Sequence, residues 1–328
     1  MYEKFYHLSG LPFLLTPDSR FFFGSSGHSR AIAHLVYGLA QEEGFIVITG
    51  EVGAGKTTLV EQLWKQLDRQ TYFIARIVTT QVSADDLLRL VMDNFGIGDT
   101  PGLDKATLLR RFEFMVQEQR RAGRRCLLVV DEVQNLPLSA LEELRMLSNI
   151  TVDGHASLQT ILLGQPQFRP ILASRDAEQL RQRVLASYHL GPLTEAETRS
   201  YIDHRLKMVG WEGDPHWDDD AYAAVYRHTG GIPRRINTLC SRILLYGSLE
   251  ETHAITGAMA DITAGELSQD LGAGTVQAMS QPSLVNGGAD EYEAMLRRIE
   301  ALEASAARQD RVFRRMLDLF GAIREQPR

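Results

Sequence analysis

Residues 50–57 read Gly50-Glu51-Val52-Gly53-Ala54-Gly55-Lys56-Thr57. The stretch fits the pattern G-x-x-x-x-G-K-[ST] at every fixed position. An apolar, β-branched run at residues 45–49 precedes it, and apolar residues at helical spacing follow over residues 58–64. A phosphate-binding loop requires this context of a strand before it and a helix after it. The alternative, a chance glycine-rich turn before a helix, is therefore disfavoured.

The backbone N–H groups of such a loop turn towards a polyphosphate, and the helix presents the positive end of its dipole to the same ligand. We expect Lys56 to reach the β- and γ-phosphates and the Thr57 hydroxyl to ligate Mg²⁺. The predicted cofactors are therefore ATP and Mg²⁺. The predicted nucleotide-binding residues are Gly50, Glu51, Val52, Gly53, Ala54, Gly55, Lys56, Thr57 and Thr58.

A second apolar run, at residues 126–130, ends at an acidic pair, Asp131 and Glu132. It lacks polar alternation, as expected for a strand of a parallel sheet that is covered on both faces. Ligands collect at the carboxyl ends of such strands. We expect Asp131 to hold Mg²⁺ through water and Glu132 to orient or deprotonate the attacking water.

Four more polar residues are candidates for the same chemistry. Gln165 follows a predicted strand and would contact the γ-phosphate or the water, or else be an ordinary hydrogen-bonded loop residue. Arg181 and Arg183 precede the last predicted strand; one of them would reach a neighbouring subunit's γ-phosphate, or both form a surface basic pair. Arg234 lies at the start of a helix opened by a proline, and from there it could reach back to the nucleotide.

Strands alternate with helices as far as residue 190, and the pattern is helical beyond it, including a predicted helix over residues 254–267. The predicted fold is an α/β P-loop NTPase with a parallel sheet, a small all-helical lid and a C-terminal helical tail. The expected parts are an N-terminal segment that packs on the core (1–40), the nucleotide-binding core (41–191), the lid (192–267), a flexible linker (268–290) and an amphipathic or coiled-coil helix (291–328). That last helix packs back on its own chain or associates with a partner or a second copy.

Composition narrows the class of protein. The chain has 328 residues and a formal net charge of -7, which argues against a surface built mainly for nucleic acid. No apolar stretch approaches the ~20 residues that span a bilayer, and the N-terminus lacks a secretory signal. We expect a cytoplasmic protein without direct membrane insertion, peripheral at the inner membrane through partners if at all. Cys126 and Cys240 are predicted to be buried free thiols.

Together these motifs resemble the AAA+ (ASCE) ATPases, and as far as about residue 265 the chain resembles their ExeA/GspA-type branch. Within that branch it is most similar to the ATPase associated with exosortase (PEP-CTERM) and exopolysaccharide loci of Gram-negative bacteria. Ala54 and Val133 depart from the residues frequent at those positions. The matching stretches are residues 5–18, 49–58, 130–136, 144–149, 163–166, 180–183 and 230–234.

The resemblance implies strand order 5-1-4-3-2, a sensor-1 role for Gln165 and a sensor-2 role for Arg234. The arginine finger maps best onto Arg183, with Arg181 second. It also implies a homo-oligomeric ring, for example a hexamer, and partners from envelope export or polysaccharide machinery.

The sequence leaves three hypotheses of function open. The leading hypothesis is an ATP hydrolase that drives or regulates an envelope process, with exopolysaccharide or exosortase-linked export favoured over secretion-type assembly. The second is a DNA-dependent ATPase of the transposition-helper type, for which pairs of arginines such as Arg120-Arg121 and Arg124-Arg125 supply a basic track. The third is a nucleotide-gated scaffold with little turnover.

Overall fold

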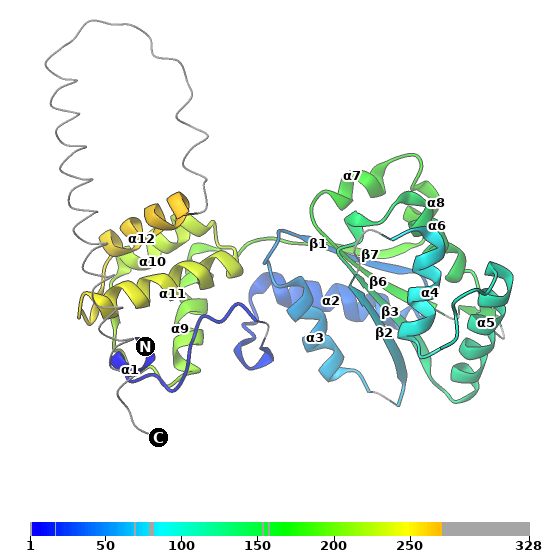
Figure 1. Ribbon diagram of the computed structural model, residues 1–328, viewed down its shortest axis with the longest axis horizontal. Helices are drawn as coiled ribbons and strands as arrows, with labels where there is room; N and C mark the ends of the chain where they lie inside the picture. The colour runs from blue at the N-terminus through cyan, green and yellow to red at the C-terminus, as the bar shows by residue number, and fades with distance from the viewer. Residues whose placement is uncertain are drawn as a thin grey trace, which may run out of the picture.

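The described part of the chain forms an α/β core and a smaller helical lid, which lie at opposite ends of the view in Figure 1. The structure is a computed structural model that describes residues 2–270, apart from residues 17, 69, 79–81, 153 and 157. The N-terminal stretch and the segment after the last core strand both run between the two bodies. The predicted linker covers residues 268–290, but residues 268–270 belong to the last helix of the lid, which corrects its start. The rest of that linker and the predicted C-terminal helix lie outside the described residues.

The core is built on a five-stranded sheet in which every neighbouring pair is parallel. Its order is β2-β3-β6-β1-β7, which from the β7 edge corresponds to 5-1-4-3-2 along the chain and confirms the expected order. Two further short strands, β4 (Thr151–Val152) and β5 (His155–Ala156), pair with each other. The sheet strands are β1 (Phe45–Gly50), β2 (Tyr72–Val78), β3 (Arg125–Asp131), β6 (Leu158–Gly164) and β7 (Val184–Leu190).

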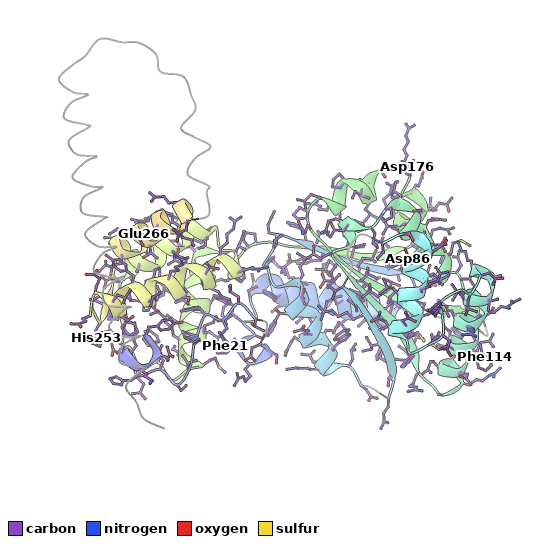
Figure 2. All side chains as sticks on the ribbon, in the orientation of Figure 1. Phe21, Asp86, Phe114, Asp176, His253 and Glu266 are labelled. Atoms are coloured by element: carbon purple, nitrogen blue, oxygen red, sulfur yellow. The ribbon has the colours of Figure 1, made fainter. Side chains whose placement is uncertain are left out.

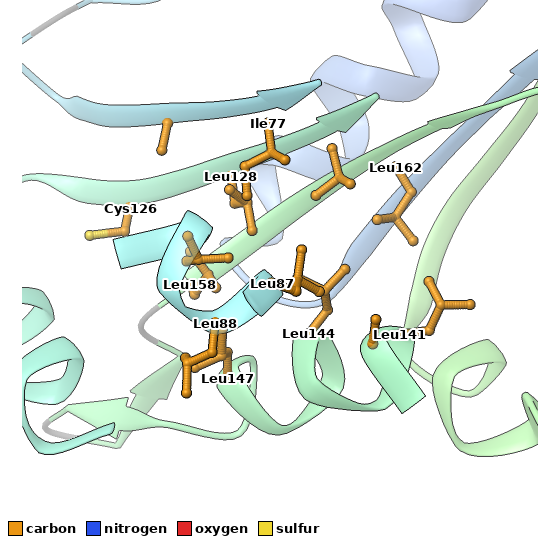
Figure 3. Close-up of a cluster of buried hydrophobic side chains, with 14 of the residues drawn as sticks. Ile77, Leu87, Leu88, Cys126, Leu128, Leu141, Leu144, Leu147, Leu158 and Leu162 are labelled. Atoms are coloured by element: carbon orange, nitrogen blue, oxygen red, sulfur yellow. The ribbon is translucent and has the colours of Figure 1, made fainter. Parts of the chain in front are cut away.

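Helices cover both faces of the sheet, as the unbroken apolar strands predict. Because side chains alternate along a strand, Phe45 and Val47 pack into one buried cluster while Ile46 and Ile48 pack into the other. Figure 3 shows the first cluster, where leucines of the helices meet leucines of the strands. The helices on that face are α4 (Ala84–Asn94), α5 (Lys105–Arg121) and α6 (Leu138–Leu147), and those on the other are α2 (Ser26–Ala40) and α3 (Lys56–Gln66).

The lid packs four helices around its own buried cluster. Thr194 and Glu197 form a capping box at the start of the first helix, which explains why it begins there. The predicted helix over residues 254–267 is corrected at both ends, because the helix begins at Gly257 and continues to Asp270. The first two residues of the predicted range instead form strand β9 (Ala254–Ile255), which pairs with β8 (His216–Trp217). The helices are α9 (Glu195–Lys207), α10 (Asp219–Thr229), α11 (Pro233–Leu249) and α12 (Gly257–Asp270).

The N-terminal segment divides between the two bodies, whereas residues 1–40 were expected to pack on the core. Helix α1 (Tyr2–Phe5) and the residues after it, as far as Phe21, bury their aromatic rings in the lid cluster. The Arg205 guanidinium of the lid donates to the Pro12 carbonyl at 2.6 Å. Only α2 packs on the sheet. Apolar spacing predicts that rings are buried but does not say against which body.

Two smaller expectations can be compared directly with the structure. Cys126 and Cys240 are buried free thiols, as predicted, and burial raises the pKa of Cys126 to about 12. Among the described residues, no helix combines the length and the apolar character that a membrane crossing needs. Short helical turns complete the core: η2 (Val133–Asn135), α7 (Phe168–Ala173) and α8 (Glu178–Arg181). The turn η1 (Ser19–Phe21) lies in the N-terminal stretch and buries Phe21 in the lid cluster.

Candidate functional site

The loop between β1 and α3 has the conformation that its glycines predict. Gly53 and Gly55 have φ values of 82° and 96°, a region that other residues rarely adopt. Space also restricts these positions. A Cβ on Gly53 would lie 2.3 Å from the Cβ of Arg234, and one on Gly55 would lie 2.9 Å from the Nε2 of His28. The lid, through Arg234, and helix α2, through His28, therefore pack closely against the loop.

Lys56 occupies the first position of α3, and its side chain is buried. Its Nζ donates to the carbonyl oxygens of Gly50 at 2.7 Å and Glu51 at 3.0 Å. Burial lowers the pKa of Lys56, whereas the carboxylates of Glu132, Asp131 and Glu51 act in the opposite direction. An ammonium group held by its own loop is available for exchange onto phosphate oxygens, which are stronger acceptors.

Thr57 and Asp131 come together where the loop meets the end of β3. The Thr57 hydroxyl donates to Oδ2 of Asp131 at 2.9 Å, and the Asp131 side chain is buried. A hydroxyl and a carboxylate are oxygen ligands of the kind that Mg²⁺ prefers, with phosphates and water completing its shell. These residues therefore fit a magnesium ion. Among the described residues, no cluster of three or more His, Cys, Asp or Glu side chains forms a metal site by itself.

Glu132 lies at a strained turn after β3, with φ 54° and ψ 38°. Its Oε2 accepts hydrogen bonds from the side-chain amides of Gln134 at 2.6 Å and Gln165 at 2.8 Å. Gln134 also accepts the backbone N–H of Gln165 at 2.9 Å. The two glutamines therefore hold one oxygen of the carboxylate between the ends of β3 and β6. A contact of Gln165 with the γ-phosphate stays a prediction.

A cavity of about 400 Å³ opens where the loop, the N-terminal stretch and the lid meet. This volume lies in the range typical of small-molecule and cofactor sites. Lys56, Thr57 and Glu132 line its core side, and Arg234 lines it from the lid. Phe21, one of its aromatic residues, lies on the stretch between the two bodies (Figure 2). Most of the predicted nucleotide-binding loop and the acidic residue Glu132 thus line one cavity, whereas Asp131 lies beside it, bonded to Thr57.

The lid side of this cavity is held by buried polar contacts. Arg205 stacks over the ring of Phe21 at 4.6 Å and donates to the Tyr201 hydroxyl at 2.9 Å. That hydroxyl in turn donates to Oδ1 of Asn237 at 2.8 Å. The backbone N–H of Arg234 donates to the Gly53 carbonyl at 3.2 Å, so the lid touches the loop directly.

Arg181 and Arg183 lie elsewhere. Arg183 donates to the Ser148 hydroxyl at 3.2 Å, and Arg181 donates to the Ala173 carbonyl at 3.0 Å. Arg183 lines a second depression together with Glu142 and other residues, and neither arginine lines the cavity at the loop. Within one chain they are therefore separate from the site, as an arginine that acts on a neighbouring subunit would be.

Sequence reasoning missed several residues of the site. Arg76, on β2, forms an ion pair with Asp131 at 3.2 Å; its one signal was a charge inside an otherwise apolar strand. Gln134 belongs to the matching stretch at residues 130–136, but no role in the site was predicted for it. His28 lines the cavity, and its Nδ1 lies 2.7 Å from the Ser25 hydroxyl that caps α2. Burial lowers the pKa of His28, and Glu197 acts against that shift.

Known proteins are similar to this chain in sequence. A family profile described as an AAA domain matches residues 39–172, which include the loop and the acidic pair. General secretion pathway protein A of Aeromonas hydrophila is 35% identical over 277 residues, which are 84% of this chain and 50% of that protein. The chain thus spans half the length of this relative.

Solved structures share the fold at lower sequence identity. The Cdc6p structure from Pyrobaculum aerophilum has a TM-score of 0.58 at 17% identity and covers 77% of this chain and 68% of its own. The Aeropyrum pernix ORC2 protein, in its ADPNP-ADP complexes, has a TM-score of 0.55 at 16% identity, with 73% and 66% covered. A Thermotoga maritima RuvB structure has a TM-score of 0.51 at 17% identity, with 76% and 70% covered. These likenesses establish a P-loop NTPase fold.

Proposed function

We propose that this chain, which matches an AAA-domain profile over residues 39–172 and is similar in sequence to general secretion pathway protein A, is a magnesium-dependent ATP hydrolase serving a cell-envelope process. The arrangement that carries the proposal is the loop beside the acidic pair: Glu132 lines the same cavity as Lys56 and Thr57, and Asp131 accepts the hydrogen bond of the Thr57 hydroxyl. Binding and hydrolysis of ATP at that place would change contacts on both the core and the lid.

The chain's own residues divide the chemistry. Loop N–H groups and Lys56 bind the phosphates, while Thr57 and Asp131 would hold Mg²⁺, which supplies positive charge to the transferred phosphoryl group. Glu132 orients the attacking water and accepts its proton. Gln165, with its amide 2.8 Å from the Glu132 carboxylate, is placed to move from that carboxylate to the γ-phosphate.

The orientation of the lid would change with the bound nucleotide. Arg234 lines the cavity, and its backbone N–H is bonded to Gly53 of the loop. A γ-phosphate that attracts the Arg234 guanidinium would therefore alter the lid angle through a contact that already exists. The proposed oligomer is a ring in which Arg183, or Arg181, approaches the site of the next subunit.

The proposed envelope process has two candidate forms. A secretion-type role is suggested by the name of the Aeromonas relative. A role in exopolysaccharide or exosortase-linked export rests on the motif resemblance alone. In either case the protein would act from the cytoplasm and reach the membrane through partners.

The DNA-dependent alternative gains little from the structure. Arg125 forms an ion pair with Glu42 at 2.6 Å, and Arg120 lies 3.9 Å from the same carboxylate. The Arg124 guanidinium instead lies 5.5 Å from the ring of Phe73. These arginines are partly neutralised or engaged within the chain, so they do not form the continuous basic track that the hypothesis needs.

A turnover assay separates the hydrolase from the nucleotide-gated scaffold. Phosphate release by the purified protein is measured for the wild type, Lys56→Ala and Glu132→Gln. We expect Lys56→Ala to lose tight ATP binding, and Glu132→Gln to keep binding while its kcat falls about 10²-fold or more. A Glu132→Gln protein as fast as the wild type would refute the role of Glu132, and a wild type that binds ATP without turnover would favour the scaffold.

A further inference from the structure

Arg76 connects the acidic end of β3 to the helix that follows the loop. It lies on β2, at the edge of the sheet next to β3. Its Nη2 donates to Oδ2 of Asp131 at 3.2 Å, and its Nη1 donates to Oε1 of Glu61, on α3, at 3.2 Å. The side chain of Arg76 is 25% exposed and that of Asp131 is 6% exposed, so this pair is screened less than a surface ion pair.

The Asp131 oxygen that accepts from Arg76 is the one that also accepts from the Thr57 hydroxyl. The other oxygen of the carboxylate accepts the backbone N–H of Glu132 at 3.0 Å. Of these three donors, only Arg76 carries a formal positive charge. A buried carboxylate needs such a charge when no metal is present, because an uncompensated buried anion is costly.

Arg76 is not optimally satisfied as a structural residue. Its guanidinium lies 5.8 Å from the ring of Trp64, and its Nε is buried with no hydrogen-bond partner among the residues that the structure describes. Buried polar atoms in native proteins are usually paired, and exceptions often mark functional positions. In the position where its Nη2 donates to Asp131, the guanidinium therefore leaves the hydrogen bond of its Nε–H unmade.

We propose that Arg76 is a positioning residue of the metal site: it fixes the Asp131 carboxylate and, by its charge, lowers the affinity of that carboxylate for Mg²⁺. A cation beside the metal position repels a dication. Mg²⁺ is then retained mainly when nucleotide phosphates add negative charge, so the metal enters and leaves with the nucleotide. This inference rests on the proposed ATP site.

The sign of the effect separates this role from a merely structural one. If Arg76 only supported the fold, removing it would misplace Asp131 and weaken the binding of Mg²⁺. If its charge opposes the metal, a neutral residue that still donates a hydrogen bond strengthens the binding of Mg²⁺ and destabilises the metal-free protein. Arg76→Gln is that neutral variant. Arg76→Lys keeps the positive charge but lacks the planar guanidinium that donates to Asp131 and Glu61 at the same time.

The experiment uses the full chain and measures binding rather than turnover. Fluorescence of N-methylanthraniloyl-ADP is followed as MgCl₂ is added after EDTA treatment, and the midpoint of the Mg²⁺ titration is recorded. Thermal unfolding is measured in EDTA and in Mg²⁺ with ADP. Arg89→Gln is the matched control, since Arg89 is 32% exposed, forms an ion pair with Asp86 and donates to the Leu103 carbonyl, away from the cavity.

We expect Arg76→Gln to lower the Mg²⁺ midpoint about threefold to tenfold, with Arg76→Lys and Arg89→Gln near the wild type. In EDTA, Arg76→Gln should unfold about 2–6 °C below the wild type, and the gap should narrow with Mg²⁺ and ADP because the metal replaces the lost cation. An unchanged or raised midpoint, or a gap equal in both conditions, refutes the role of Arg76. A wild type that binds no nucleotide at saturating MgCl₂ instead refutes the ATP site and this inference with it.

Discussion

The backbone N–H of Arg234 donates a hydrogen bond to the carbonyl oxygen of Gly53, 3.2 Å away. Gly53 lies inside the phosphate-binding loop with φ 82°, and Arg234 lies in the first turn of lid helix α11. The phosphate-binding loop therefore forms part of the surface on which the lid rests. A ligand that moves either residue changes the contact between the two bodies, which gives nucleotide binding a direct route to the lid.

Gly53→Ala tests this contact. The new Cβ would lie 2.3 Å from the Cβ of Arg234, and φ 82° would be strained for alanine. We expect the free energy of unfolding to fall by about 1–2 kcal/mol from the backbone alone, and by more from the clash, with nucleotide affinity reduced. Gly96→Ala is the control, because Gly96 has φ 76° and nothing within 4 Å. Equal losses in urea unfolding for both variants would mean that the lid contact contributes nothing.

Gln134→Ala tests the two-glutamine clamp on Glu132. The substitution removes the amide that donates to Glu132 at 2.6 Å and the oxygen that accepts from Gln165. A hydrogen bond to a charged group is worth about 1.5–3 kcal/mol, so we expect kcat to fall roughly tenfold to a hundredfold while ATP affinity is kept. The exposed Gln167 supplies the control variant Gln167→Ala. The clamp would be discarded if kcat of Gln134→Ala matched that of the control.

Arg183→Ala tests action between subunits. An arginine finger supplied by a neighbour is worth about 10³-fold or more in kcat, and its loss should leave nucleotide affinity nearly unchanged. Mixing Arg183→Ala with the inactive Lys56→Ala protein should restore part of the phosphate release, because each mixed interface can combine an intact loop with an intact arginine. Arg181→Ala, tested in the same way, shows which arginine acts. A mixture as inactive as its components would exclude Arg183 as the trans residue.

The pH dependence of stability tests the environment of His28. Burial lowers the pKa of His28, so the unfolded chain, where the pKa is about 6.5, binds the proton more tightly than the folded chain. The free energy of unfolding should therefore fall as the pH drops below about 6.5. His28→Gln should flatten that fall between pH 7 and 5, whereas His34→Gln, an exposed position on the same helix, should not. Since burial also lowers the pKa values of His189 and His204, some slope will persist.

Much of the core could be predicted from local sequence. The strand, loop and helix around residues 50–57, and the apolar run that ends at Asp131, each depend on neighbours within a few residues. The sheet order, which the structure confirms, was implied by the family resemblance and not by any local pattern. The acidic pair was placed near the loop for a general reason, since parallel strands end at one edge of a sheet.

The remaining features depend on contacts between residues far apart in the chain. No local pattern distinguishes burial of the N-terminal aromatic residues in the lid from burial on the core. The same holds for Arg76, 55 residues before Asp131, and for Gln165, 33 residues after Glu132. The sequence by itself determined which residues could bind phosphate and metal, because those motifs are local. Only the tertiary structure decided which side chains restrain them, because side-chain reach and packing between separate elements set those contacts.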